Sequence, residues 1–513
     1  MTASVLVVGL DAAEATLIEA WAARGDLPHF KALIARAAAY KVANSLRTLP
    51  GAIWPELVTG VSSGRHAEYY HPAQLHSGEA ERRPIVADEV DGARYYWTHA
   101  ARAGRSVAAL DMPQTVLSPV AGPVQLLEWG LHDRHLGAGA TPEDFANRVR
   151  ARYGTHPITS CDLHGQTAQG YGDLLARLKE GASRKAALLE DTLRSAHFDL
   201  FTATFSECHC VGHQFWHFQD PAHPWHGRDA SHDFENAILD VYRRIDDGLG
   251  RLIAAAGETA DIVVLTSHGM GLYTGGPYIL QELLARMGLS SARDSGLARF
   301  ARGLQKSQNP IAGAVRAVVR NTIGTRALRK AQAEVGALRQ PLRDPRTRAI
   351  DVPNNRCGAV RLNLKGREPF GEVAPGNEEM AILADIREAL AALRDPGTGE
   401  PIVAETITAR EAFGADHHPD VPDLMVVFRD DLGILNDAFS PRFGHIHAPV
   451  YRRDLPRSGD HTTQSRIWLA GPRVGTPRFE CRGNVLDLAP TVLDLLGLDP
   501  APGMDGHSLL RAC

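Results

Sequence analysis

This sequence has no long apolar run, few cysteines and no excess of basic charge, and each absence excludes a class of protein. No stretch of about 18 uninterrupted apolar residues occurs, so we expect neither a membrane span nor a membrane partner. The start, MTASVLVVGLDAAEA, has no basic segment ahead of an apolar run, so we expect no secretory signal. Six cysteines scattered through 513 residues do not indicate a disulfide framework and favour a reduced, cytoplasmic setting. A net charge of −5 argues against polymeric nucleic acid as a partner.

The chain does have the size and composition of a large folded protein. Hydrophobic residues make up 44% and charged residues 22% of the 513 residues. This length exceeds one simple domain and allows a large core with insertions. The sequence carries no signal for the oligomeric state.

Short apolar runs alternate with longer segments of helical periodicity along much of the chain. The runs predict buried strands, and such alternation is typical of βαβ units. We therefore predict an α/β fold with a doubly wound, mostly parallel sheet and helices on both faces. The expected strands are residues 5–10, 106–110, 199–205, 261–266, 424–428 and 467–471, and the main expected helices are residues 14–24, 171–196, 233–256 and 487–498.

The rhythm of strands and helices changes in the second half of the chain. Residues 291–350 are rich in Arg, Ala and Gln without a strand pattern, which predicts a helical insertion or cap. Strand patterns resume after it, and residues 351–429 are interpreted as a small subdomain. Residues 1–290 and 430–513 are then the core.

Two groups of polar residues follow strands in the first half of the chain. Asp11 comes directly after the first strand, where an Asp either caps a helix or binds a ligand. His209 and His213 follow the strand at 199–205, with Glu207 just upstream. An i, i+4 histidine pair on a helical turn suits one tetrahedral metal ion. The alternative is a His-rich loop, or core histidines bonded to backbone carbonyls.

Two further motifs add histidines from distant parts of the chain. Ser267 and His268 follow the strand at 261–266, and Asp460 precedes His461 in a Gly-Asp-His motif. Because ligands bind at the carboxyl ends of parallel strands, we expect these residues to converge with Asp11. Neutral imidazole suits zinc better than calcium or magnesium, and manganese and iron are alternatives.

With these motifs in order, the chain resembles the alkaline phosphatase superfamily, in its type I phosphodiesterase/nucleotide pyrophosphatase branch. The resemblance covers most of the chain. It is carried by GLDAAEA, LPGAIWPELVTGVSSGRH, HCVGH, TSHGM, CGAVRLNLKGREPFGEV, PDLMV, GDH and DLAPTVLDLLG. It implies an alkaline phosphatase-like fold that holds two metal ions, usually zinc, beside a Ser or Thr nucleophile.

By position, the resemblance implies that residue 209, His213 and His461 hold one metal ion. Asp11, residue 267, His268 and the nucleophile would then hold the second ion.

The chain departs from the family pattern at three of these positions. His209 and Ser267 stand where the family has Asp, and the nucleophile position falls on Pro50, which has no side-chain oxygen. Thr48 is the nearest hydroxyl and is our candidate catalytic residue, with water or a substrate group as the alternatives. Glu207 is a candidate replacement carboxylate, and Asp460 is expected to orient His461.

The loss of carboxylates changes the charge balance. Two divalent ions with Asp11 as the one aligned carboxylate would leave a net charge of about +3. Such an uncompensated charge is unfavourable in a buried cleft. We therefore predict that His209, His213 and His461 form the better metal site. The site at Asp11 and His268 should be weak, empty or completed by substrate.

The predicted function is metal-dependent hydrolysis of a small-molecule phosphoric ester, either a phosphodiester or a nucleotide pyrophosphate-like substrate. One zinc ion is expected and a second is allowed. The alternatives are a transferase or lyase on the same scaffold, and a catalytically silent metal- or ligand-binding homologue.

Overall fold

The computed structural model describes most of the chain. The described residues are 3–43, 50–69, 74–79, 82–130, 136–158, 167–227, 234–290, 342, 345–352, 357–429, 431–448, 457–475 and 481–511. Most of the predicted insertion at 291–350, and Thr48, lie outside them.

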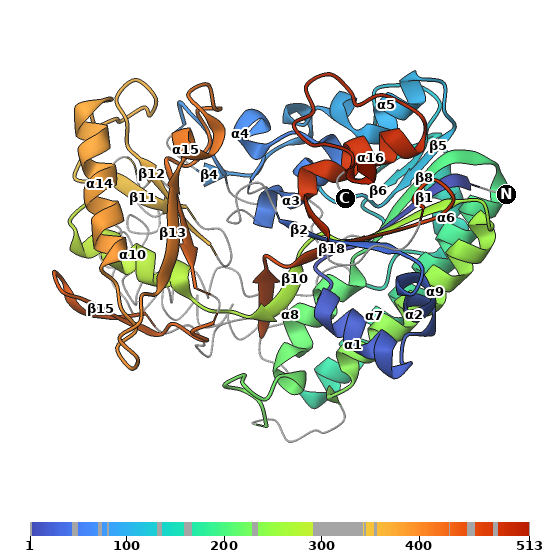
Figure 1. Ribbon diagram of the computed structural model, residues 1–513, viewed down its shortest axis with the longest axis horizontal. Helices are drawn as coiled ribbons and strands as arrows, with labels where there is room; N and C mark the ends of the chain where they lie inside the picture. Colours follow the sequence, from blue (N-terminus) through green and yellow to red (C-terminus); the bar gives the residue numbers. More distant parts are fainter. Residues whose placement is uncertain are drawn as a thin grey trace, which may run out of the picture.

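A nine-stranded sheet forms the centre of the larger part of the molecule (Figure 1). Its order is β19 (Cys481–Asn484), β2 (Ala38–Ala43), β18 (Ser465–Ala470), β9 (Asp261–Thr266), β1 (Ala3–Leu10), β8 (Phe198–Phe205), β5 (Val107–Leu110), β6 (Val124–Leu127) and β7 (Gly139–Thr141). The run β9-β1-β8-β5-β6 is parallel, whereas β18 and the edge strand β7 are antiparallel to their neighbours. The prediction of a mostly parallel α/β sheet is confirmed.

Helices cover both faces of this sheet, because its strands carry apolar side chains on both faces. In β1, Leu6 and Val8 pack in one cluster, while Val5 and Val7 pack in another. The first cluster takes in α1 (Ala15–Arg24), α2 (Pro28–Ile34), α6 (Phe145–Tyr153), α7 (Ala168–Ser195), α8 (Glu207–Gln219) and α9 (Ala237–Ala256). The second takes in α3 (Ile53–Thr59), α5 (Tyr96–Arg102) and α16 (Leu488–Leu495). Figure 1 shows these two sets of helices on opposite sides of the sheet.

A second, smaller unit surrounds a four-stranded antiparallel sheet, and Figure 1 shows it beside the large sheet. The strand order is β11 (Ala349–Val352), β12 (Gly358–Leu362), β14 (Leu424–Phe428) and β13 (Val403–Thr408). Its helices are α10 (Gly276–Arg286), α14 (Asn377–Ala391) and α15 (Ala409–Phe413). The apolar cluster of this unit also includes residues 279–289 and 435–446, which the sequence assigns to the core. The proposed domain boundaries stay a prediction.

The remaining elements are short. Among the described residues, three two-stranded ribbons pair β3 (Gln74–Leu75) with β4 (Arg82–Arg83), β15 (Asp437–Ser440) with β16 (Gly444–His447), and β10 (Gly269–Leu272) with β17 (Gly459–Thr462). The short helix α4 spans Ser63–His66. The β10–β17 ribbon brings the TSHGM and GDH motifs side by side.

Two expectations drawn from composition can be compared with the structure. Within the described part of the chain, no helix combines the length and the apolar character needed to cross a bilayer. Cys481 takes part in a disulfide bond. Because reducing compartments disfavour such bonds, this cysteine gives no support to a cytoplasmic location, which stays a prediction.

Candidate metal centre

The ends of three neighbouring strands set the position of the candidate site. In the parallel register, Leu10 of β1 lies beside Phe205 of β8 and Thr266 of β9. The residues that follow these strands therefore emerge at one edge of the sheet, as ligand-binding residues do in open α/β folds. Asp11 and Ser267 lie there, and α8 begins there.

Helix α8 presents His209 and His213 one turn apart, as the spacing predicts. The third histidine, His461, comes from β17, where it pairs across the ribbon with Met270. Helix and ribbon can approach because both carry glycine at the contact. A Cβ on Gly459 would lie 2.4 Å from the carbonyl oxygen of Gly212, closer than packing allows.

The three imidazoles converge through their Nε2 atoms. These atoms lie 3.2 Å apart for His209 and His213, 3.1 Å for His213 and His461, and 3.0 Å for His209 and His461. All three side chains are buried. The Nδ1 atom of His213 lies 2.7 Å from the carbonyl oxygen of Gly459 and must donate to it, so its Nε2 carries the lone pair.

This geometry fits a metal ion. Zinc–nitrogen bonds of about 2.0–2.1 Å in a tetrahedral site place two ligand nitrogens about 3.3 Å apart, close to the separations here. Three neutral imidazoles are also a ligand set that zinc accepts with a fourth position open. The carbonyl of Gly459 fixes the ring of His213 in the manner usual for a metal-binding histidine.

The residues expected to hold a second ion are arranged differently. Oδ1 of Asp11 accepts from the Trp54 indole at 2.7 Å and from the Ser267 hydroxyl at 3.2 Å. His268 stacks on His461, with ring centroids 4.1 Å apart and planes 22° apart. Among the described residues, Asp11 and His268 belong to no group of three or more ligand atoms close enough for one ion.

Glu207 joins a buried polar network instead of the three-histidine group. Its Oε1 accepts from Nε2 of His156 at 2.9 Å. Burial raises the pKa of Glu207. The charge of Lys185 and the hydrogen bond from His156 lower that pKa by more, so it lies below its usual value. Lys185 donates to Oδ2 of Asp111 at 3.0 Å, and the carboxylates of Asp111 and Glu207 raise its pKa despite burial. No sequence pattern indicated this network, since His156 and Lys185 stand in no motif.

Asp460 and Arg457 lie close to His461 and His213. Oδ1 of Asp460 accepts from the backbone N–H of His461 at 2.9 Å, so this contact fixes the backbone of β17 and not the imidazole. Arg457 brings a guanidinium nitrogen to 3.4 Å from Nε2 of His213. Arg457 was not predicted from the sequence, where its one signal is its place two residues before the Gly-Asp-His motif.

The position aligned with the family's nucleophile lies just before α3. Pro50 begins a short 3₁₀ turn, Pro50–Ala52, that leads into α3. The Trp54 indole of α3 donates to Asp11, so this helix lies beside Asp11. Thr48 lies outside the described residues and stays a prediction.

Solved structures share this fold at low sequence identity. Phosphonoacetate hydrolase from Sinorhizobium meliloti 1021, in complex with phosphonoacetate, matches with a TM-score of 0.53 and 12% identity, over 96% of each chain. Alkaline phosphatase PafA matches with a TM-score of 0.54 and 12% identity, over 100% of this chain and 98% of that chain. Murine ectonucleotide pyrophosphatase/phosphodiesterase 5 is a weaker match that does not bear on the fold, with a TM-score of 0.49 and 14% identity, over 98% of this chain and 97% of that chain.

Comparison with protein families settles the resemblance seen in the sequence. No curated protein matches the chain. Residues 5–444 match the family model described as type I phosphodiesterase / nucleotide pyrophosphatase, which covers most of the chain. The resemblance to the alkaline phosphatase superfamily is therefore confirmed. The chain belongs to the type I phosphodiesterase / nucleotide pyrophosphatase family and is a phosphoester hydrolase.

Proposed function

We propose that this chain hydrolyses a small phosphodiester or nucleotide pyrophosphate-like substrate with a zinc ion held by His209, His213 and His461. The observation that carries the proposal is the convergence of three buried Nε2 atoms within 3.2 Å of one another. Three mutually adjacent neutral imidazoles are readily explained by a shared cation, which accepts all three lone pairs at once. The family to which the chain belongs indicates the class of reaction, and the three histidines indicate where the metal would bind.

The ligand chemistry favours zinc over the hard cations. Imidazole nitrogen suits zinc, whereas calcium and magnesium prefer oxygen. Manganese and iron also accept imidazole and are the alternatives. A second ion at Asp11, Ser267 and His268 would bind more weakly, because Oδ1 of Asp11 already accepts hydrogen bonds from Trp54 and Ser267.

The residues around the ion would each have a defined part. Gly459 holds His213 in the tautomer that presents Nε2, and Gly212 lets α8 come close enough for that contact. Three protein ligands would leave a zinc ion able to accept one more ligand, such as a substrate oxygen. A bound zinc ion supplies Lewis-acid polarisation of a phosphoryl oxygen and offsets the negative charge that develops there. Thr48 is the proposed nucleophile, with water or a substrate group as the alternatives.

The test combines metal analysis with activity. Protein purified without chelator is expected to contain about one zinc ion per chain. His213→Ala and His461→Ala should each lose that metal and the hydrolysis of bis(p-nitrophenyl) phosphate, while retaining the circular-dichroism spectrum. His445→Ala, at an exposed position of β16, is the matched control and should keep both. A wild-type protein with activity but no stoichiometric zinc, manganese or iron would refute the proposal.

A further inference from the structure

A cavity of about 480 Å³, which none of the three histidines lines, lies on the side of the large sheet that α5 and α16 cover (Figure 1). Its wall includes Arg65 of α4, Arg94 just before α5, and His99 and Arg102 of α5. Among the described residues, no Asp or Glu lines this cavity. Its volume is in the range of small-molecule sites, which recognise a ligand through a few directed polar groups.

Backbone carbonyls of the cavity wall hold two of the guanidinium groups in place. Arg65 donates through Nη1 to the Gly503 carbonyl at 2.7 Å and to Oδ1 of Asp505 at 2.9 Å. Arg102 donates through Nη1 to the Ala93 carbonyl at 2.8 Å. Gly503 and Ala93 themselves line the cavity, so these contacts fix both guanidinium groups at its wall. A guanidinium has five N–H donors, and within the described part of the chain Nη2 of each arginine stays available.

Arg94 is held by an ion pair instead. It donates through Nε to Oδ2 of Asp91 at 3.0 Å, which leaves both of its Nη groups available among the described residues. Asp91 and Asp505 keep their negative charges in these pairs, so recognition of a ligand would depend on directed N–H donors more than on net charge. Burial, and after it the charge of Arg102, lowers the pKa of His99, so its imidazole is largely neutral and can also donate.

The arrangement of these donors suits a tetrahedral anion. Three guanidinium groups from three separate segments border one cavity, and a terminal phosphate offers three oxygens to them, whereas a carboxylate offers two. Val61 and Met504 add apolar surface to the wall, which suits an organic group attached to the phosphate. The cavity therefore combines anchors for an anion with room for the rest of a small molecule.

We propose that this cavity binds the phosphate or phosphonate group of a small organic molecule through Arg65, Arg94 and Arg102. It is a second site, distinct from the metal centre. Thr59, the last residue of α3, lines the cavity, whereas the beginning of the same helix contacts Asp11. The inference therefore stands independently of the metal ion proposed above.

Calorimetric titration with phenylphosphonate, which has no ester bond to hydrolyse, tests the proposal. The full chain is first treated with a chelator, so that no metal ion binds the probe, and salt is kept at about 0.15 M to screen diffuse attraction. The wild-type protein should bind one equivalent. Arg102→Gln should weaken binding by about tenfold or more, because a charge-assisted contact is lost while no ion pair within the described residues is broken. Arg102→Lys keeps the charge without the planar guanidinium and should bind with intermediate affinity.

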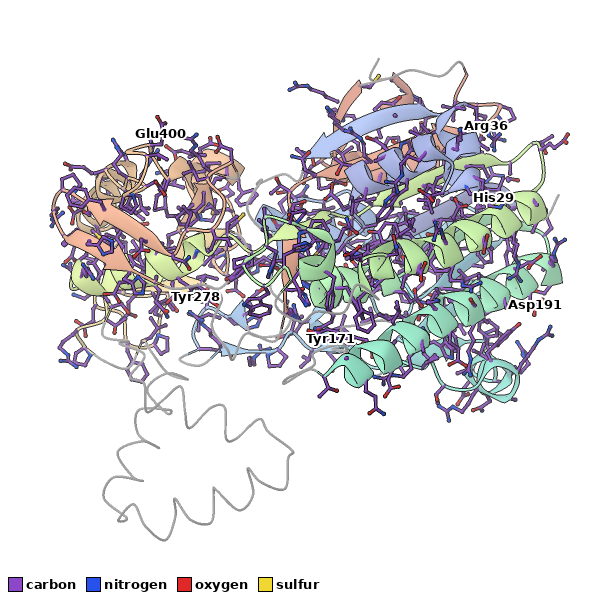
Figure 2. The ribbon with its side chains drawn as sticks, turned by 90° about the horizontal axis from the view of Figure 1, so that it is seen from below. His29, Arg36, Tyr171, Asp191, Tyr278 and Glu400 are labelled. Carbon is purple, nitrogen blue, oxygen red and sulfur yellow. The ribbon has the colours of Figure 1, made fainter. Side chains whose placement is uncertain are left out.

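Arg36→Gln is the matched control. Arg36, labelled in Figure 2, is exposed and follows α2, which covers the opposite face of the large sheet from α5. This variant should bind phenylphosphonate as the wild type does, and benzoate, whose carboxylate has two oxygens, should bind the wild type more weakly. No binding to the metal-free protein, equal weakening by Arg36→Gln and Arg102→Gln, or benzoate binding as tight as that of phenylphosphonate would each overturn the inference.

Discussion

The buried Lys185 allows a test of how charged groups behind the candidate metal site contribute to stability and to metal binding. Its ammonium group donates to Asp111 at 3.0 Å, to the Gly130 carbonyl at 3.1 Å and to the Thr204 carbonyl at 3.2 Å, so its three N–H bonds are all used. The side chain is fully buried. Replacing it with methionine keeps the approximate length and removes the charge, leaving the carboxylates of Asp111 and Glu207 without their shared cation.

The expected cost follows from that uncompensated charge. Removing one partner of a buried ion pair costs about 3–5 kcal/mol, because the other charge stays buried without compensation. Lys185→Met should therefore lower the free energy of unfolding by that amount. Lys179→Met is the matched control on the same helix, α7. Lys179 is one-third exposed, its pair with Asp240 is 3.5 Å long, and its loss should cost under about 1 kcal/mol.

A functional effect should accompany the loss of stability. Glu207 begins α8, so its rearrangement would shift the helix that carries His209 and His213. We expect zinc affinity to fall by about 10- to 100-fold, the range typical when residues behind metal ligands are replaced. Adding Glu207→Gln should restore part of the stability, because one of the two unbalanced charges is then removed.

Urea denaturation gives the stabilities, and chelator competition gives the zinc affinities. If Lys185→Met costs no more than Lys179→Met, the reasoning from buried charge is wrong. If the double variant is less stable than Lys185→Met by the full cost of Glu207→Gln alone, the two residues are not coupled.

Two further predictions concern pH and packing. Burial first, then two neighbouring histidines, lower the pKa of His217 to about 4, below its usual 6.5. The unfolded chain therefore binds more protons between those pH values, and His217 should cost about 2 kcal/mol of stability at pH 5 relative to pH 8. His217→Phe should flatten that part of the pH–stability curve, and an unchanged slope in urea melts would contradict the assignment. In Gly459→Ala, the new Cβ would lie 2.4 Å from the Gly212 carbonyl, so we expect a loss of about 1–3 kcal/mol and weaker zinc binding. Gly172→Ala, with open space around the added carbon, should be neutral or stabilising, and equal effects of the two alanines would refute the close-contact argument.

The sequence alone determined the parts of this protein that depend on local periodicity. A continuous apolar run predicts β1 and the position of Asp11 after it, because parallel strands are buried on both faces. The i, i+4 spacing of His209 and His213 predicts their common helix face, and α8 carries both. The carboxyl ends of parallel strands lie at one edge of a sheet. The strand pattern therefore also predicts that Asp11, His209 and His213 lie near Ser267.

Tertiary structure decided which neighbours each of these residues has. Glu207 stands two residues from His209 in the sequence, yet it contacts His156 and interacts electrostatically with Lys185 of α7. His461 joins the α8 histidines only because Gly459 and Gly212 allow ribbon and helix to touch. Arg457 belongs to no periodic element. Local patterns encode the face on which a side chain lies, whereas its partner depends on long-range packing that no short window of sequence contains.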